Sequence, residues 1–240
     1  MKRVVLLLAL AFLLAPMVAL ADGVSLLDFV VAPSAGASIT YDGQGGPLVG
    51  QGISIVSVEG INTPLNSGVV VPIVGGLLNF TTGGLTGTTS STWSFGGGEN
   101  SFISITGLSD VSCANVPGPQ CLTYSENGGG PPPIWLLYGG FGDATVMTFG
   151  STFKIAGSSF WDYKCWELLA FYGLGDYAFE PLMGNFNISF NAAGTPPGGF
   201  ASTQVLSGDV VNAVPEPGTL ALLGTGLLSI AGLVRRKLTS

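Results

Sequence analysis

The chain has 240 residues, a formal net charge of −7 and no histidine. Without histidine it cannot form a Ser-His-Asp or Cys-His catalytic arrangement, or a histidine-ligated zinc site. Nucleophile-elbow and phosphate-binding-loop motifs are also missing from the sequence, so we expect a protein that is not an enzyme and holds no cofactor or dedicated metal ion.

The N-terminal segment is typical of a secretory signal peptide. Basic residues at 2–3 precede an apolar stretch over 4–14, and a small-x-small sequence ends at Ala21. This order predicts export through the Sec translocon and cleavage by signal peptidase between Ala21 and Asp22. The signal then occupies residues 1–21. An uncleaved N-terminal anchor is the alternative.

Residues 22–213 form the exported part, which is strongly acidic. They include every acidic residue except Glu216 but only Lys154 and Lys164 as bases, which gives a formal charge of −11. Nucleic-acid binding needs clustered lysines and arginines, so we exclude it. The length suits one domain, and two small β domains are the alternative.

Short runs of Val, Ile, Thr, Phe and Trp, separated by turns rich in Gly and Pro, predict antiparallel strands. Several runs alternate apolar and polar residues, which is typical of strands with one buried face. The predicted fold is all-β, an antiparallel β-sandwich, with a β-barrel or two small sheets as alternatives. The predicted strands span residues 37–41, 52–60, 69–74, 77–82, 92–95, 102–106, 135–138, 144–156, 186–191 and 204–211.

A segment rich in Gly and Pro over residues 115–133 predicts a long surface loop. Cys113 and Cys121 lie close together in sequence here, and an oxidising compartment favours a disulfide between them. We expect Cys165 to stay a free, buried thiol, because it lies beside a tryptophan and two leucines. Residues 164–172 fit either two turns of helix or a fully buried strand.

The densest acidic group consists of Asp162, Glu167, Asp176 and Glu180. Two carboxyl groups beside a sugar suffice for glycoside hydrolysis, which keeps a His-free glycosidase as an alternative function. We expect instead that these are solvated loop charges, with Asp162 or Glu167 pairing with Lys164.

Trp161 and Tyr163 have polar neighbours in sequence, so we expect their side chains to be exposed. Exposed aromatic rings can stack on sugar rings, whereas buried ones serve core packing. A carbohydrate-binding module is therefore an alternative function, and these two residues are its candidate glycan contacts.

The C-terminal tail combines three features. Pro215, Glu216 and Pro217 form an extended segment, because proline cannot continue a helix. Residues 220–234 carry no charge and would span about 22 Å as a helix. With Thr219 before it and the basic residues 235–237 after it, a transmembrane helix over about 219–234 is predicted. The basic cluster places everything before this helix outside the cytoplasm.

This order of features over residues 214–240 resembles the PEP-CTERM sorting signal of Gram-negative bacteria that make exopolysaccharide. The resemblance implies that an integral-membrane exosortase recognises Pro215, Glu216 and Pro217 and processes the tail. It implies an inner-membrane intermediate and then a location at the cell surface or in the extracellular matrix. We therefore expect a structural or adhesive role linked to exopolysaccharide or biofilm. An ordinary C-terminal anchor is the alternative.

Overall fold

The computed structural model describes residues 24–109 and 134–214. All of their helices and strands, apart from the end residues Val24 and Val214, belong to one compact unit, Ser25–Ala213. The elements are the strands β1 (Val24–Val31), β2 (Ser38–Tyr41), β3 (Pro47–Gly60), β4 (Val70–Thr88), β5 (Thr92–Gly96), β6 (Phe102–Ser109), β7 (Ile134–Phe149), β8 (Thr152–Lys164), β9 (Leu182–Ala193) and β10 (Phe200–Val214), the helix α2 (Trp166–Phe171) and the 3-10 helix η2 (Gly175–Tyr177).

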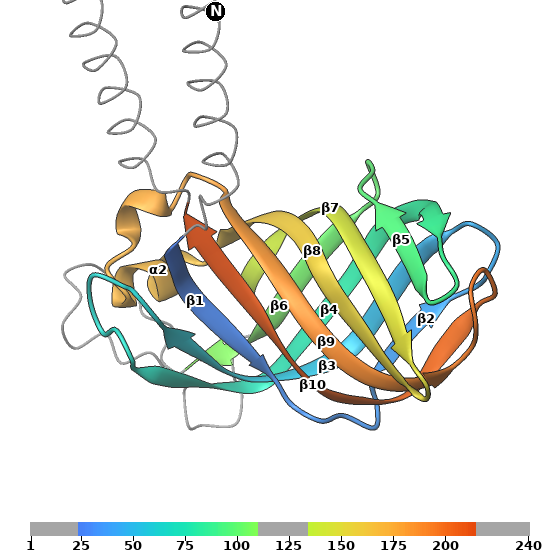
Figure 1. The fold of residues 1–240 in the computed structure, drawn as a ribbon. Coiled ribbons are helices and arrows are strands. Elements are labelled where there is room, and N and C mark those ends of the chain that lie inside the picture. The colour runs from blue at the N-terminus through green and yellow to red at the C-terminus, as the bar shows by residue number, and fades with distance from the viewer. Residues whose placement is uncertain (1–23, 110–133, 215–240) are drawn as a thin grey trace, which may run out of the picture. The chain divides into compact units, whose positions relative to one another are not determined.

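Ten antiparallel strands form a single sheet whose hydrogen-bonded pairings close into a ring (Figure 1). β1 and β2 share one position in this ring, because both lie between β3 and β10. β5 and β6 share another, between β4 and β7. β3 pairs with β4, while β8 and β9 connect β7 to β10. The ten strands therefore occupy eight positions around a common interior.

One closed sheet replaces the predicted sandwich and the alternative of two small sheets. The main reason is β4, a strand of 19 residues where the sequence predicted two shorter ones. Gly75 and Gly76 do not end the strand, because the register shift between Val74 and Leu77 absorbs them as a bulge. Gly75 has a φ of 63°, which glycine adopts readily. The continuous strand then pairs with β3, β5 and β6 in one sheet.

Other strand predictions also differ from the structure. The strand predicted over 144–156 contains a turn, since β7 ends at Phe149 and β8 begins at Thr152. Gly150 makes this turn with a φ of 69°, and the alternating pattern on both sides conceals the reversal. The sequence predicts no strand over residues 24–31, yet β1 lies there and its Leu27, Phe29 and Val31 are buried in the core.

Aromatic side chains fill the interior. A closed sheet of about eight strands leaves a space just wide enough for side chains. Gly50 allows the Phe80 ring to lie against β3, because a Cβ at position 50 would sit 2.1 Å from Cε1 of Phe80. The rings form two clusters, one of Phe80, Phe141, Phe160 and Phe186 and one of Tyr41, Trp93, Phe95, Phe153, Phe190 and Phe200.

The segment that fitted helix or strand forms α2. A helix brings Leu168, Leu169 and Tyr172 to one face, and all three are buried. The Tyr172 hydroxyl donates to the carbonyl oxygens of Val58 (3.0 Å) and Val69 (2.9 Å). These contacts hold α2 at one end of the sheet, next to β3 (Figure 1).

Candidate functional site

The last four residues of β8 point alternately outward and inward. Trp161 and Tyr163 are 45% and 44% exposed, whereas Asp162 and Lys164 are 0% and 8% exposed. Successive side chains of a strand point to opposite faces of a sheet. One short segment therefore supplies two candidate sites, one on the outer face and one in the interior.

On the outer face, Trp161 and Tyr163 lie beside Trp135 and Tyr138 of β7. Tyr138 is paired with Tyr163 in the register of β7 and β8, so their side chains are neighbours. The Trp135 and Tyr138 rings are stacked at 4.7 Å, and the Trp161 and Tyr163 rings meet edge to face at 6.1 Å. All four are at least 42% exposed. We call these four residues the aromatic face.

The Trp161 indole lies against the backbone of β7. Its register partner is Gly140, where a Cβ would sit 2.9 Å from Cζ2 of the indole. On the other side, Trp161 is paired with Met183 of β9, which is 48% exposed. Because Gly140 has no side chain, the Trp161 indole can pack directly on the backbone of β7. Met183 extends the apolar surface on the β9 side.

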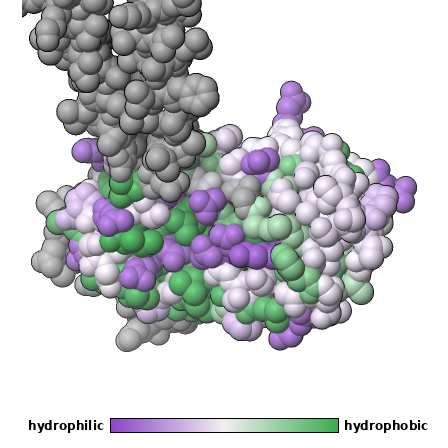
Figure 2. All heavy atoms as spheres, in the orientation of Figure 1, coloured by the Kyte–Doolittle hydropathy of each residue, from purple (hydrophilic) through white to green (hydrophobic). Residues whose placement is uncertain are grey.

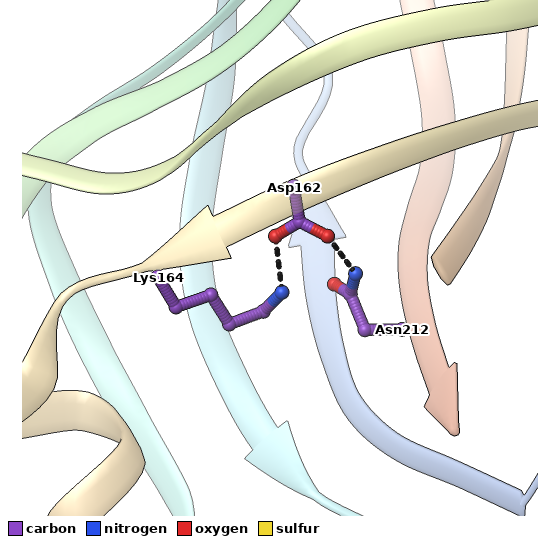
Figure 3. Close-up of polar contacts among 3 residues, drawn as sticks. All are labelled: Asp162, Lys164 and Asn212. Atoms are coloured by element: carbon purple, nitrogen blue, oxygen red, sulfur yellow. Dashed lines mark hydrogen bonds and ion pairs between the residues drawn. The ribbon is translucent and has the colours of Figure 1, made fainter. Parts of the chain in front are cut away.

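In the interior, Asp162, Lys164 and Asn212 form a polar cluster (Figure 3). The Lys164 amine pairs with one carboxylate oxygen of Asp162, and the Asn212 amide donates to the other. The predicted pairing of Asp162 with Lys164 is thus present, but the prediction of a solvated loop charge is wrong for Asp162, which is buried. β8 continues beyond the predicted strand end at residue 156, and its alternation turns these two side chains inward.

Burial dominates the electrostatics of this interior cluster. It raises the pKa of Asp162, and the charge of Lys164 opposes that rise. It lowers the pKa of Lys164, and Asp162 opposes that fall. Each charge loses several kcal/mol of hydration on burial. Burial therefore favours the uncharged state of the pair, a neutral Lys164 amine beside a protonated Asp162, over the ion pair. The side-chain oxygen of Asn212 is buried and has no hydrogen-bond partner in the described part of the chain.

The other members of the acidic group do not share this position. Glu167 lies half-buried in the first turn of α2, and Asp176 and Glu180 are exposed. Asp162 faces the interior and therefore forms no surface site with them. Among residues 24–109 and 134–214, no group of three or more His, Cys, Asp or Glu residues could hold a metal ion.

Cys165 carries a free thiol, as predicted, but it is half-buried rather than buried. Burial raises its pKa to about 11, so the thiol stays protonated and unreactive near neutral pH. Cys113 and Cys121 lie outside the described residues, and their disulfide stays a prediction.

Three carboxylates lie on the neighbouring strands β3, β1 and β10. Asp28 of β1 is paired with Glu59 of β3, and Asp209 belongs to β10, which also pairs with β1. Burial, followed by the charges of Asp209 and Glu59, raises the pKa of Asp28 to about 6. The face shown in Figure 2 has a band of hydrophilic residues bordered by hydrophobic ones.

Asp28→Asn should stabilise the folded protein at pH 7 by roughly 1 kcal/mol, after a discount for solvent screening of a half-exposed group. Because the pKa of Asp28 is raised in the folded state, the folded protein binds the proton more tightly than the unfolded chain. The wild type therefore gains stability from this group as the pH falls from 7 through about 6, and the asparagine variant lacks that gain. Urea unfolding at pH 7 and pH 5 measures the difference.

The control for this prediction is Asp176→Asn, which removes an exposed carboxylate and should change the free energy of unfolding little at either pH. Equal stability of wild type and Asp28→Asn at pH 7 would contradict the burial of Asp28 and its repulsion by Asp209 and Glu59 as causes of a raised pKa.

Comparison with family models identifies a PEP-CTERM protein-sorting motif at residues 213–237. This confirms the resemblance of the tail and implies processing by exosortase and export to the cell surface. No curated protein and no solved structure matches the chain. Within residues 24–109 and 134–214, no helix is long and apolar enough to span a membrane.

The motif residues Pro215, Glu216 and Pro217 lie outside the described residues, as do the predicted helix over 219–234 and the basic residues 235–237. The predicted cleavage site between residues 21 and 22 lies outside them as well. The boundaries of the signal, the exported part and the tail stay predictions.

Proposed function

We propose that this exported, exosortase-processed protein has a structural or adhesive role in the extracellular polysaccharide of the cell that makes it, and that it is not an enzyme. The sorting motif at residues 213–237 carries the proposal, because it directs the protein to the cell surface. The charge of −11 over residues 22–213 supports a soluble, self-repelling exported part.

The chemistry of the side chains supports a non-enzymatic role. The chain has no histidine to act as a general base near neutral pH. A glycosidase needs two carboxyl groups on opposite sides of one sugar. Asp162 is buried in the interior, which leaves Glu167, Asp176 and Glu180 as candidates, and the two glutamates are the pair to be tested.

Carbohydrate binding is the second candidate function, and the aromatic face favours it. Four exposed rings on two adjacent strands present stacking surfaces for the apolar faces of sugars. The ordered contacts of Trp135 with Tyr138 and of Trp161 with Gly140 keep these rings in place without a ligand. Preorganised rings lose little conformational entropy on binding.

Trp161→Ala combined with Tyr163→Ala should weaken binding to exopolysaccharide from the producing bacterium at least about tenfold, because each lost stacking face costs about 1 kcal/mol. Cosedimentation of the purified protein with the polysaccharide measures the affinity, and a reducing-sugar assay on the same samples should detect no hydrolysis. Phe149→Ala is the control, since Phe149 is 65% exposed at the opposite end of β7.

Equal weakening by Phe149→Ala, or no weakening by the double variant, would place glycan binding away from the aromatic face. Sugar release that disappears with Glu167→Gln or Glu180→Gln would contradict the non-enzymatic role.

A further inference from the structure

The interior cluster brings together an amine, a carboxamide and an acid, the three groups that an amide-forming reaction needs. Asp162 contacts the Lys164 amine with one oxygen and the Asn212 amide with the other. Figure 3 shows both side chains pointing at this carboxyl group, with the Asn212 oxygen turned toward the Lys164 amine. The amine and the carboxamide therefore contact the two oxygens of the same carboxyl group.

The surroundings of the cluster exclude water. Asn212 and Asp162 are 0% exposed and Lys164 is 8% exposed. The Asn212 amide and the Phe160 ring both pack against Gly184 of β9, where a Cβ would sit 2.9 Å from Nδ2 of Asn212 and 2.3 Å from Cζ of Phe160. Exclusion of water removes the competing nucleophile and strengthens every electrostatic interaction in the cluster.

The protonation states that burial favours are also the reactive ones. A lowered pKa gives Lys164 access to its neutral amine form, which is nucleophilic. A raised pKa gives Asp162 access to its acid form, which donates a proton. The Asn212 oxygen, which has no partner among the described residues, is free to accept that proton.

We propose that Lys164 and Asn212 become joined by an amide bond between Nζ of Lys164 and Cγ of Asn212, with Asp162 carrying protons between them. The Asn212 carboxamide first turns so that its oxygen, rather than Nδ2, faces Asp162. Nζ then attacks Cγ while the acid form of Asp162 donates a hydrogen bond to this oxygen. Asp162 then transfers a proton from Nζ to Nδ2, the bond between Cγ and Nδ2 breaks, and ammonia leaves. One amine and one primary amide give one secondary amide and ammonia, so no oxidant or other reactant is needed.

The bond would link β8 to β10 across β9. Asn212 directly precedes residue 213, where the sorting motif begins. A force applied through the C-terminal segment would therefore pass to β8 through a covalent bond as well as through the hydrogen bonds of β10 with β9. This inference does not depend on glycan binding.

Proteolysis of the unfolded protein tests the bond. Mature protein recovered from cells that express the full chain is denatured and digested with trypsin, which needs a free lysine amine. We expect cleavage after Lys154 and none after Lys164. A protease that cleaves before aspartate should then release a branched peptide that joins residues 162–175 to the peptide starting at Asp209. Its mass should be about 17 Da, the mass of ammonia, below the sum of the two peptides.

Lys154→Met is the matched control, because Lys154 lies on the same strand and outside the interior cluster, and it should keep the branched peptide. Asn212→Ala and Lys164→Met should abolish the branch, and Asp162→Asn should lower the cross-linked fraction at least about tenfold. The wild-type result stands even where a variant fails to fold, because the digest uses unfolded protein. Cleavage after Lys164 in the wild type, or a branch from Lys164 to any residue other than Asn212, would overturn the proposal.

Discussion

Replacing Pro215, Glu216 and Pro217 with alanine should leave almost all of the protein full length and held in the inner membrane. The motif implies processing by exosortase, and we expect Pro-Glu-Pro to be the element that the enzyme recognises, whereas export depends on the separate N-terminal signal predicted over residues 1–21. Without recognition, the apolar residues 220–234 stay attached and keep the chain in the bilayer. Immunoblots of inner-membrane, outer-membrane and matrix fractions give the distribution and length of the protein.

A matched control changes an exposed Glu-Pro pair away from the motif, Glu180→Ala with Pro181→Ala, which should be processed like the wild type. If the triple variant loses its tail and reaches the matrix normally, Pro-Glu-Pro is not the recognition element.

In protein whose Lys164 and Asn212 are not covalently joined, Asp162→Ala should lower the free energy of unfolding by about 3–5 kcal/mol, the range for a buried charge that loses its partner. The substitution leaves the Lys164 amine and the Asn212 amide without their shared acceptor in an apolar interior. Asp162→Asn keeps the side-chain volume and one acceptor, so it should lose less. Urea unfolding of residues 22–213 measures the three proteins.

The control for the interior cluster is Asp176→Ala, which removes an exposed carboxylate and should change the free energy of unfolding by less than about 0.5 kcal/mol. A loss of under about 1 kcal/mol for Asp162→Ala would contradict the burial and pairing described for the cluster.

The strands follow from local patterns, but their closure into a ring does not. Alternation of apolar and polar residues predicts where most strands lie, because one face of each is buried. The ring depends on which distant strands pair. β1, the first strand, pairs with β10, the last, as well as with nearby β3. Local patterns also missed the turn at Gly150, since alternation continues on both sides of it.

Both candidate sites depend on the C-terminal part of β8, which lies beyond the predicted strand end at residue 156. Had β8 been extended through Lys164, alternation would have placed Asp162 and Lys164 inward and Trp161 outward. The partnership with Asn212 could not be inferred in this way, because β9 separates β8 from β10 and the contact spans the interior. The sorting motif was recognised because its information lies in the order of residues along the chain.

The most direct test is the identity of the two ends of the protein recovered from the extracellular matrix. Mass spectrometry of terminal peptides from matrix and inner-membrane fractions provides them. We expect matrix protein that begins at Asp22, ends close to Pro215–Pro217 and lacks residues 220–234. Protein that occurs only in the inner membrane and keeps residues 220–234 would contradict export and sorting to the cell surface.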